Sequence, residues 1–182
     1  MGMSVAFKEW AVVCEALGTG LQSVIIRKGG IAEGRAGFSF RHEEFVLFPT
    51  WFHEQLGKTT LPADTPVPEE PGEELEIRYT ATVEWNGLLT NREQVARLKE
   101  FHVLHDSVVE ERFCYDGDDG VYVAFVRVYR LDPPLCLKNE KKYGGCRSWV
   151  ELPEIEGSVL VSVLTDEEHA RRKKVLGDLL GL

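Results

Sequence analysis

The sequence predicts an α+β fold: a largely antiparallel, partly barrel-like sheet with an N-terminal helix, one or two central helices and a C-terminal helix. Several segments have the alternating or β-branched composition of strands. These segments follow one another without the regular crossover helices that a parallel sheet needs. Helical apolar spacing occurs near both ends of the chain and in its middle. We expect residues 1–182 to form a single domain.

The N-terminal part of the chain predicts one helix and three short strands. Residues 5–17 carry apolar side chains at steps of three and four, the spacing of one helix face: Phe7, Trp10, Cys14 and Leu17. Short strands are expected at 24–26, 38–40 and 45–48. Pro49 should end the last of them, because proline cannot donate a hydrogen bond to a neighbouring strand.

Residues 57–74 differ in composition from their surroundings. They hold four prolines and five acidic residues, with few apolar side chains to bury: Pro62, Pro66, Pro68, Pro71, Asp64, Glu69, Glu70, Glu73 and Glu74. A segment of this kind contributes little to a packed core. We expect an acidic, proline-rich loop inserted within the single domain; the alternative is a connector between two small domains.

The middle of the chain predicts one long strand followed by short helices. Residues 75–85 alternate apolar and polar side chains, as in a strand with one buried face. Residues 86–87, Asn-Gly, are a turn signal. A helix over 91–100 would bury Val95, Leu98 and Phe101, and a second short helix is expected after Asp106.

The C-terminal third predicts a central strand, two shorter strands and a helix. Residues 121–131 are apolar on both faces, and Asp-Pro-Pro at 132–134 should end that strand. Shorter strands are expected at 146–152 and 159–164. A capping box at Thr165 opens the final helix, whose buried stripe should include Val175, Leu179 and Leu180.

Charge and cysteine usage restrict the class of protein. The chain has 21 basic and 30 acidic residues, a net charge of −9, which excludes a protein that coats nucleic acid or anionic lipid indiscriminately. No apolar run reaches the ~20 residues of a membrane helix, so we expect a cytoplasmic protein without membrane contact. The four cysteines lack the close pairs of a zinc site, so we expect free thiols, no metal and no cofactor: Cys14, Cys114, Cys136 and Cys146. Oligomeric state is left open.

A first candidate cluster consists of Arg27 and Lys28, followed by two glycines. Two cations at the end of a strand can bind a phosphate or carboxylate, and glycine lets the backbone approach the anion closely. The spacing matches neither a P-loop nor a dinucleotide-binding fingerprint. The alternative is a solvated strand end and turn.

A second candidate cluster lies between His42 and His53, and includes Thr50 and Trp51. Histidine can act as acid, base or ligand near neutral pH, and aromatic side chains can stack on a planar group. No metal-binding spacing is present. The alternative is ordinary core aromatics with hydrogen-bonded histidines.

A third candidate cluster is a basic and aromatic run over 138–151: its candidate ligand-binding residues are Tyr143, Arg147, Ser148 and Trp149. Such a local patch can bind a flipped base or a short single strand without making the whole protein basic. Cys146 next to Arg147 is a candidate nucleophile that would need a base. The alternative is a structural loop.

Five ordered segments together resemble one known family: K-E-W-A-V-V at 8–13, I-I-R-K-G-G-I at 25–31, F-V-L-F-P-T-W-F-H at 45–53, V-R-V-Y-R-L at 126–131 and Y-G-G-C-R-S-W-V-E-L at 143–152. Over about residues 8–168 they resemble the bacterial and archaeal family called domain of unknown function 1802. The resemblance implies no established activity. Some relatives are joined to an Mrr-type restriction endonuclease domain, which implies a link with DNA restriction. The start of the chain is also loosely similar to pseudouridine-synthase-and-archaeosine-transglycosylase-like barrels, several of which bind modified bases.

These clusters favour a module that recognises DNA, RNA or a nucleotide. Cations of the first and third clusters would hold phosphate, aromatic residues of the second and third would stack a base, and a histidine of the second would contact its edge. One alternative is a small hydrolase or transferase acting on a nucleotide-like substrate, with a histidine base and Cys146 as nucleophile. Another is a non-catalytic protein-interaction module that uses the loop at 57–74 or the basic helix surface at 171–174.

Overall fold

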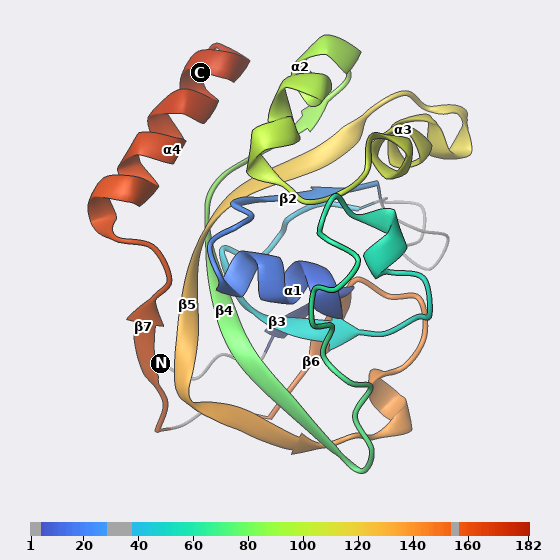
Figure 1. Ribbon diagram of the computed structural model, residues 1–182, viewed down its shortest axis with the longest axis vertical. Coiled ribbons are helices and arrows are strands. Elements are labelled where there is room, and N and C mark those ends of the chain that lie inside the picture. Colours follow the sequence, from blue (N-terminus) through green and yellow to red (C-terminus); the bar gives the residue numbers. More distant parts are fainter. Residues whose placement is uncertain (1–4, 29–37, 154–156) are drawn as a thin grey trace.

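The computed structural model describes residues 5–28, 38–153 and 157–182. In this part of the chain seven strands form one mixed, mostly antiparallel sheet (Figure 1). Its order is β2-β5-β4-β3-β1-β6, with β7 paired to β5. The strands are β1 (Val5–Trp10), β2 (Val24–Arg27), β3 (Glu44–Thr50), β4 (Glu74–Leu89), β5 (Val121–Lys138), β6 (Trp149–Glu151) and β7 (Val159–Ser162). The predicted α+β class is confirmed. The sheet curves but is not closed, since β2 and β6 at its ends do not pair within the described residues.

The described residues include four α-helices: α1 (Ala11–Gly18), α2 (Arg92–Ala96), α3 (Asp106–Cys114) and α4 (Asp166–Leu180). Figure 1 shows α1 against one face of the sheet, with α2 and α3 together near β2 and α4 beside β5. The predicted N-terminal, central and C-terminal helices are therefore all present. Among the described residues, none of these helices combines the length and apolar character needed to cross a membrane.

The prediction of one helix over 5–17 is wrong in its first half. Residues 5–10 form β1, which pairs in parallel with β3 and antiparallel with β6. The side chains of Ala6 and Phe7, on opposite faces of β1, are both 0% exposed. A strand between two neighbours satisfies its backbone on both edges, and this tertiary pairing outweighs the helical spacing of the side chains. The helix begins only at Ala11.

Two predicted strand boundaries near β3 are also wrong. Residues 38–40 form no strand, although Phe38 and Phe40 are buried in the core. Pro49 does not end β3, which continues to Thr50 in register with β1. β4 pairs with β3 only at 44–46, so the edge of β3 that faces away from β1 has no partner strand at Pro49. No hydrogen bond on that edge needs the N–H that proline lacks.

The long antiparallel strands β4 and β5 both continue past the predicted interruptions. Asn86 and Gly87 lie inside β4, opposite Ala124 and Val123, so the predicted turn is wrong. The residues at 132–134 do not end β5: the register shifts there, from Tyr79 opposite Arg130 to Ile77 opposite Leu135. A bulge accommodates extra residues in one strand and prolines that cannot donate to the ladder.

Capping residues place the helices where the sequence predicts them. The Asn91 Oδ1 accepts from Glu93 N at 2.8 Å at the start of α2, which continues as a 3-10 turn over Arg97–Phe101. The Thr165 Oγ1 accepts from Glu168 N at 3.2 Å at the start of α4. The predicted stripe of α4 is partly wrong, because Val175 is exposed whereas its buried side chains are His169, Leu176 and Leu180.

The buried imidazole of His102 makes the fold sensitive to acid. Its side chain accepts a hydrogen bond from Leu104 N at Nδ1, 3.1 Å away, and is 7% exposed. Burial is the main cause that lowers the pKa of His102 from 6.5 to about 4. Below pH 6.5 the unfolded chain therefore binds a proton that the folded chain does not, and the folded state loses stability as the pH falls towards 4.

We predict that His102→Gln flattens the dependence of unfolding free energy on pH between 6.5 and 4. The wild-type protein should lose on the order of 3 kcal/mol more than the variant across this range. Urea unfolding at several pH values measures the difference. His105→Gln is the matched control, because His105 is an exposed histidine in the same segment and its removal should leave the slope unchanged. Parallel pH profiles for wild type and His102→Gln would contradict the prediction.

Candidate functional site

A cation-lined pocket lies where the ends of β1 and β2 meet α3 and the segment before β6. Its volume is about 220 Å³. We call it the arginine pocket; it is lined by Trp10, Arg27, Lys28, Lys58, Val108, Glu111, Arg112, Tyr115 and Cys146. Four of these residues are basic and one is acidic. A strongly positive pocket has thus formed in a chain with a net charge of −9.

Arg112 of α3 forms the buried wall of the arginine pocket. Its side chain is 13% exposed, and its Nη2 lies 3.9 Å from the Glu9 Oε1. Its Nη1 donates to the carbonyl oxygen of Ile26, and its guanidinium lies 4.9 Å from the centre of the Trp10 ring. Burial lowers the pKa of Arg112 and the nearby Arg27 adds to this effect, but a guanidinium remains charged at any physiological pH.

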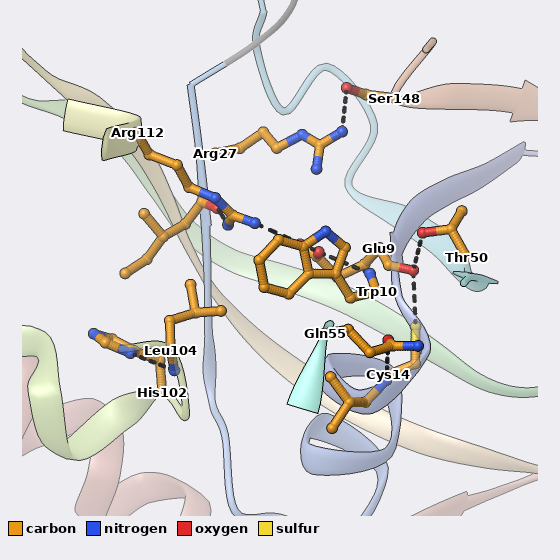
Figure 2. A network of polar contacts seen from close by, with 12 residues as sticks. Glu9, Trp10, Cys14, Arg27, Thr50, Gln55, His102, Leu104, Arg112 and Ser148 are labelled. Atoms are coloured by element: carbon orange, nitrogen blue, oxygen red, sulfur yellow. Dashed lines mark hydrogen bonds and ion pairs between the residues drawn. The ribbon is translucent and has the colours of Figure 1, made fainter. Parts of the chain in front are cut away.

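Arg27 brings a second guanidinium to the same pocket. It is half-buried at the end of β2, 5.6 Å from the centre of the Phe7 ring, and its Nη2 donates to the Ser148 Oγ at 3.3 Å. In Figure 2 the guanidinium group of Arg27 points toward Ser148 and that of Arg112 toward Glu9; both arginines line the same pocket. Two like charges at one cavity repel each other, and an anion between them would remove that cost.

Glu9 positions this arrangement. The side chain is 1% exposed and its Oε1 accepts from Trp10 N at 2.9 Å. The carbonyl oxygen of Glu9 accepts from Thr50 Oγ1 at 3.0 Å and from Cys14 Sγ at 3.8 Å (Figure 2). Because the carboxylate lies behind Arg112 and does not line the cavity, it holds the arginine in place and leaves the pocket surface cationic.

Lys28 adds a positive charge to the arginine pocket and also donates hydrogen bonds to backbone carbonyls at and after the end of α3. Its Nζ donates to the carbonyl oxygens of Gly120 at 2.9 Å, Phe113 at 3.5 Å and Asp118. Backbone carbonyls solvate an ammonium without cancelling its charge. The two glycines that follow Lys28, which we expected to let the backbone approach an anion, lie outside the described residues.

Trp149 and His42 line neither the arginine pocket nor the cavity that adjoins it, and are packed against other residues. Trp149 is 9% exposed, with its ring near those of Phe7, Phe38 and Phe45. His42 meets its ring edge-on, with centroids 4.8 Å apart. Burial, followed by the charge of Arg41, lowers the pKa of His42, which favours the neutral imidazole. Ser148, the partner of Arg27, is buried next to Trp149.

A second cavity of about 420 Å³ adjoins the first, and we call it the lysine cavity. It is lined by Lys8, Phe48, Pro49, Thr50, Trp51, Glu70, Pro71, Leu75, Asn139, Glu140, Lys141, Tyr143, Gly144 and Gly145. Thr50, Trp51 and Tyr143 of the predicted set thus share one cavity. Tyr143 is buried against Phe48, with ring centroids 5.7 Å apart, whereas Trp51 is half-buried and its Nε1 donates to Pro68 O at 2.8 Å.

The structure separates the remaining predicted residues. Arg147 is exposed and close enough to lower the pKa of Lys8, which lies at the edge of the lysine cavity. His53 is exposed and lines neither cavity. Cys146 lines the arginine pocket, but no histidine lines it within the described residues. The described part of the chain also contains no cluster of three or more residues suited to a metal ion.

Several residues that position the site were missed from the sequence. Lys8, Glu9 and Trp10 lie in a segment that we interpreted as a helix, and Arg112 lies in a helix that we treated only as core. Gln55 is 3% exposed, and its Oε1 accepts a hydrogen bond from Val12 N over 3.1 Å. This bond satisfies a backbone N–H that has no partner within the first turn of α1. For Lys8, Glu9 and Trp10 the sequence signal was the segment at 8–13, which is part of the family resemblance; none of the five segments covers Gln55 or Arg112.

Comparison with protein families identifies the chain. The family model described as Domain of unknown function (DUF1802) matches residues 6–175. The chain belongs to the DUF1802 family. This confirms the resemblance found in the sequence, whereas the link to Mrr-type domains remains an expectation.

Similarity to individual proteins is weak. None of the curated proteins matches the DUF1802 chain. Among solved structures it is similar to ASCH from Zymomonas mobilis, with 12% identity, a TM-score of 0.49 and coverage of 94% of each chain. Two single-substitution variants of that protein also match. One has 12% identity and a TM-score of 0.49, with coverage of 94% of this chain and 96% of the other. The second has 11% identity and a TM-score of 0.47, with coverage of 94% of each chain.

We predict that Glu9→Gln destabilises the protein by about 3 kcal/mol, because it leaves the Arg112 guanidinium buried without its counter-charge. Urea unfolding at neutral pH measures the change. Glu76→Gln is the matched control: it breaks an exposed ion pair with Arg78 and should cost less than about 1 kcal/mol. Equal stability of the two variants would show that the Glu9–Arg112 pair does not hold the pocket together.

Proposed function

We propose that this DUF1802 protein is a nucleic-acid or nucleotide recognition module whose arginine pocket binds a phosphate group. The convergence of Arg27 and Arg112 on one small cavity carries the proposal. The planar, permanently charged guanidinium offers paired N–H donors that match the oxygens of a phosphate. Lys28 and Lys58 add positive charge to the same walls.

Aromatic side chains in the arginine pocket favour a ligand that carries a base. Trp10 and Tyr115 line the cavity, Trp10 half-buried and Tyr115 42% exposed. Stacking on such rings recognises any base through its π-face. The burial of Trp149 and Tyr143 against neighbouring rings leads us to assign stacking in this pocket to Trp10 and Tyr115 instead.

The enzyme alternative and the α4 form of the protein-interaction alternative receive less support. A Cys146 nucleophile would need a base, and no histidine lines its pocket within the described residues. For a protein-interaction surface on α4, the basic run at 171–174 is largely engaged within the chain. Arg172 Nη1 donates to Gly20 O at 2.6 Å and Ser23 Oγ at 2.8 Å, and Lys173 Nζ lies 2.8 Å from Glu84 Oε2.

We predict that Arg27→Met weakens binding of short single-stranded DNA or RNA about tenfold or more, because a charged hydrogen bond to phosphate is lost. Fluorescence anisotropy at low and at physiological salt measures the affinity. Arg97→Met is the matched control, since Arg97 is exposed on the 3-10 turn after α2 and lines neither cavity. Absence of binding by the wild-type protein at low salt, or equal losses in both variants, would overturn the proposed function.

Cys146 supplies a second readout of the same pocket. A bound ligand should cover this exposed thiol and slow its alkylation by iodoacetamide, as followed by mass spectrometry. Cys136 is exposed on β5 and lines neither cavity, so its alkylation should not change. Equal protection of both thiols, or of neither at saturating ligand, would place the ligand outside the arginine pocket.

A further inference from the structure

The arginine pocket and the lysine cavity meet along a narrow boundary. Trp10 of the first lies in register with Thr50 of the second, on neighbouring strands β1 and β3. On the other side, Gly145 of the lysine cavity precedes Cys146 of the arginine pocket. We call the segment Gly144–Cys146 the ridge. The linings of the two cavities therefore adjoin at these two places, and we call the two cavities together with the ridge the groove.

Lys8 lies beneath the ridge as a buried cation. It is 6% exposed, and its Nζ donates to Gly145 O at 2.9 Å. Within the described residues no carboxylate lies within ion-pair distance of Lys8. Burial, then Arg147, and more weakly Arg27, lower its pKa. Three cations thus surround the ridge, and an anion placed there would relieve both the desolvation and the repulsion.

Aromatic surfaces lie on both sides of the ridge. Lys8 and Trp10 are two residues apart on β1, so their side chains leave the same face of the strand about 7 Å apart. Trp10 faces the arginine pocket, and Trp51, held by its hydrogen bond to Pro68 O, lines the lysine cavity. Alternating cations and aromatic rings along a groove are the general pattern of single-strand binding sites.

The charges of the lysine cavity indicate which part of a ligand it would take. Glu70 and Glu140 line it together with Lys8 and Lys141, and Glu140 also pairs with Lys142 at 3.0 Å. The two carboxylates would repel a phosphate in the cavity itself. The favourable position for a second phosphate is therefore the ridge, whereas the cavity with Trp51 suits an uncharged base.

We propose that a single strand of nucleic acid crosses the ridge, with one phosphate in the arginine pocket, a second between Lys8 and Arg147, and a base against Trp51 in the lysine cavity. This inference rests on the proposed function and adds its ligand class: a single strand of at least two nucleotides. In a duplex the bases are stacked and paired inside the helix, so they cannot reach Trp51.

The test compares a nucleoside monophosphate with single strands of increasing length and with a duplex of the same sequence. Affinity should rise at least tenfold from the monophosphate to a tetranucleotide, and the single strand should bind more tightly than the duplex. Lys8→Met and Arg147→Ala should each lower tetranucleotide affinity about tenfold and leave monophosphate affinity unchanged. Each should also reduce the slope of log affinity against log salt by about 0.7, the expected value for one phosphate contact of a single strand.

Lys99→Met is the matched control, because Lys99 is an exposed lysine paired with Asp106 and lines neither part of the groove. Arg147 is exposed, so Arg147→Ala keeps the test valid if Lys8→Met does not fold. Equal affinities for monophosphate and tetranucleotide, equal affinities for single strand and duplex, or equal losses in Lys99→Met and Arg147→Ala would overturn the ridge crossing while leaving phosphate recognition intact. Failure of every ligand to bind would instead overturn the proposed function.

Discussion

The buried ion pair of Glu9 and Arg112 is the contact on which the candidate site depends. It joins the end of β1 to α3, two elements about a hundred residues apart in the sequence, and brings a guanidinium beside the Trp10 ring. Such a pair gains little net stability over apolar packing, yet removing either member leaves a costly buried charge. Its consequence is positional: it fixes where the cationic wall of the pocket lies.

Two other cations of the groove, Lys28 and Lys8, are held by backbone carbonyls. Lys28 donates to carbonyls at the end of α3 and in the turn that follows it, Lys8 donates to Gly145 O, and Arg112 also donates to Ile26 O. A carbonyl satisfies the donors of a cation without neutralising it. Within the described residues Glu111 is the one acidic residue that lines the arginine pocket, so a local positive field persists there in a protein of net charge −9.

Local sequence signals predicted the elements whose causes are local. Asn91 and Thr165 cap their helices through side-chain oxygens, and the alternation over 75–85 matches a strand with buried Leu75 and Ile77. The errors occurred where pairing with distant strands decides the outcome. β1 lies between β3 and β6. The antiparallel pair of β4 and β5 includes Asn86 and Gly87, and its ladder resumes beyond a register shift at the prolines at 133–134.

For the site, the sequence alone determined its chemistry: a few cations and aromatic rings, clustered near residues 27, 51 and 147, in an otherwise acidic chain. Only the tertiary structure decided which of them meet. It placed Arg27 with Arg112 and Trp10, packed Trp149 and Tyr143 into the interior, and left His53 outside both cavities. The physical reason is that side-chain type is a local property, whereas burial and proximity depend on strand pairing between residues far apart in the chain.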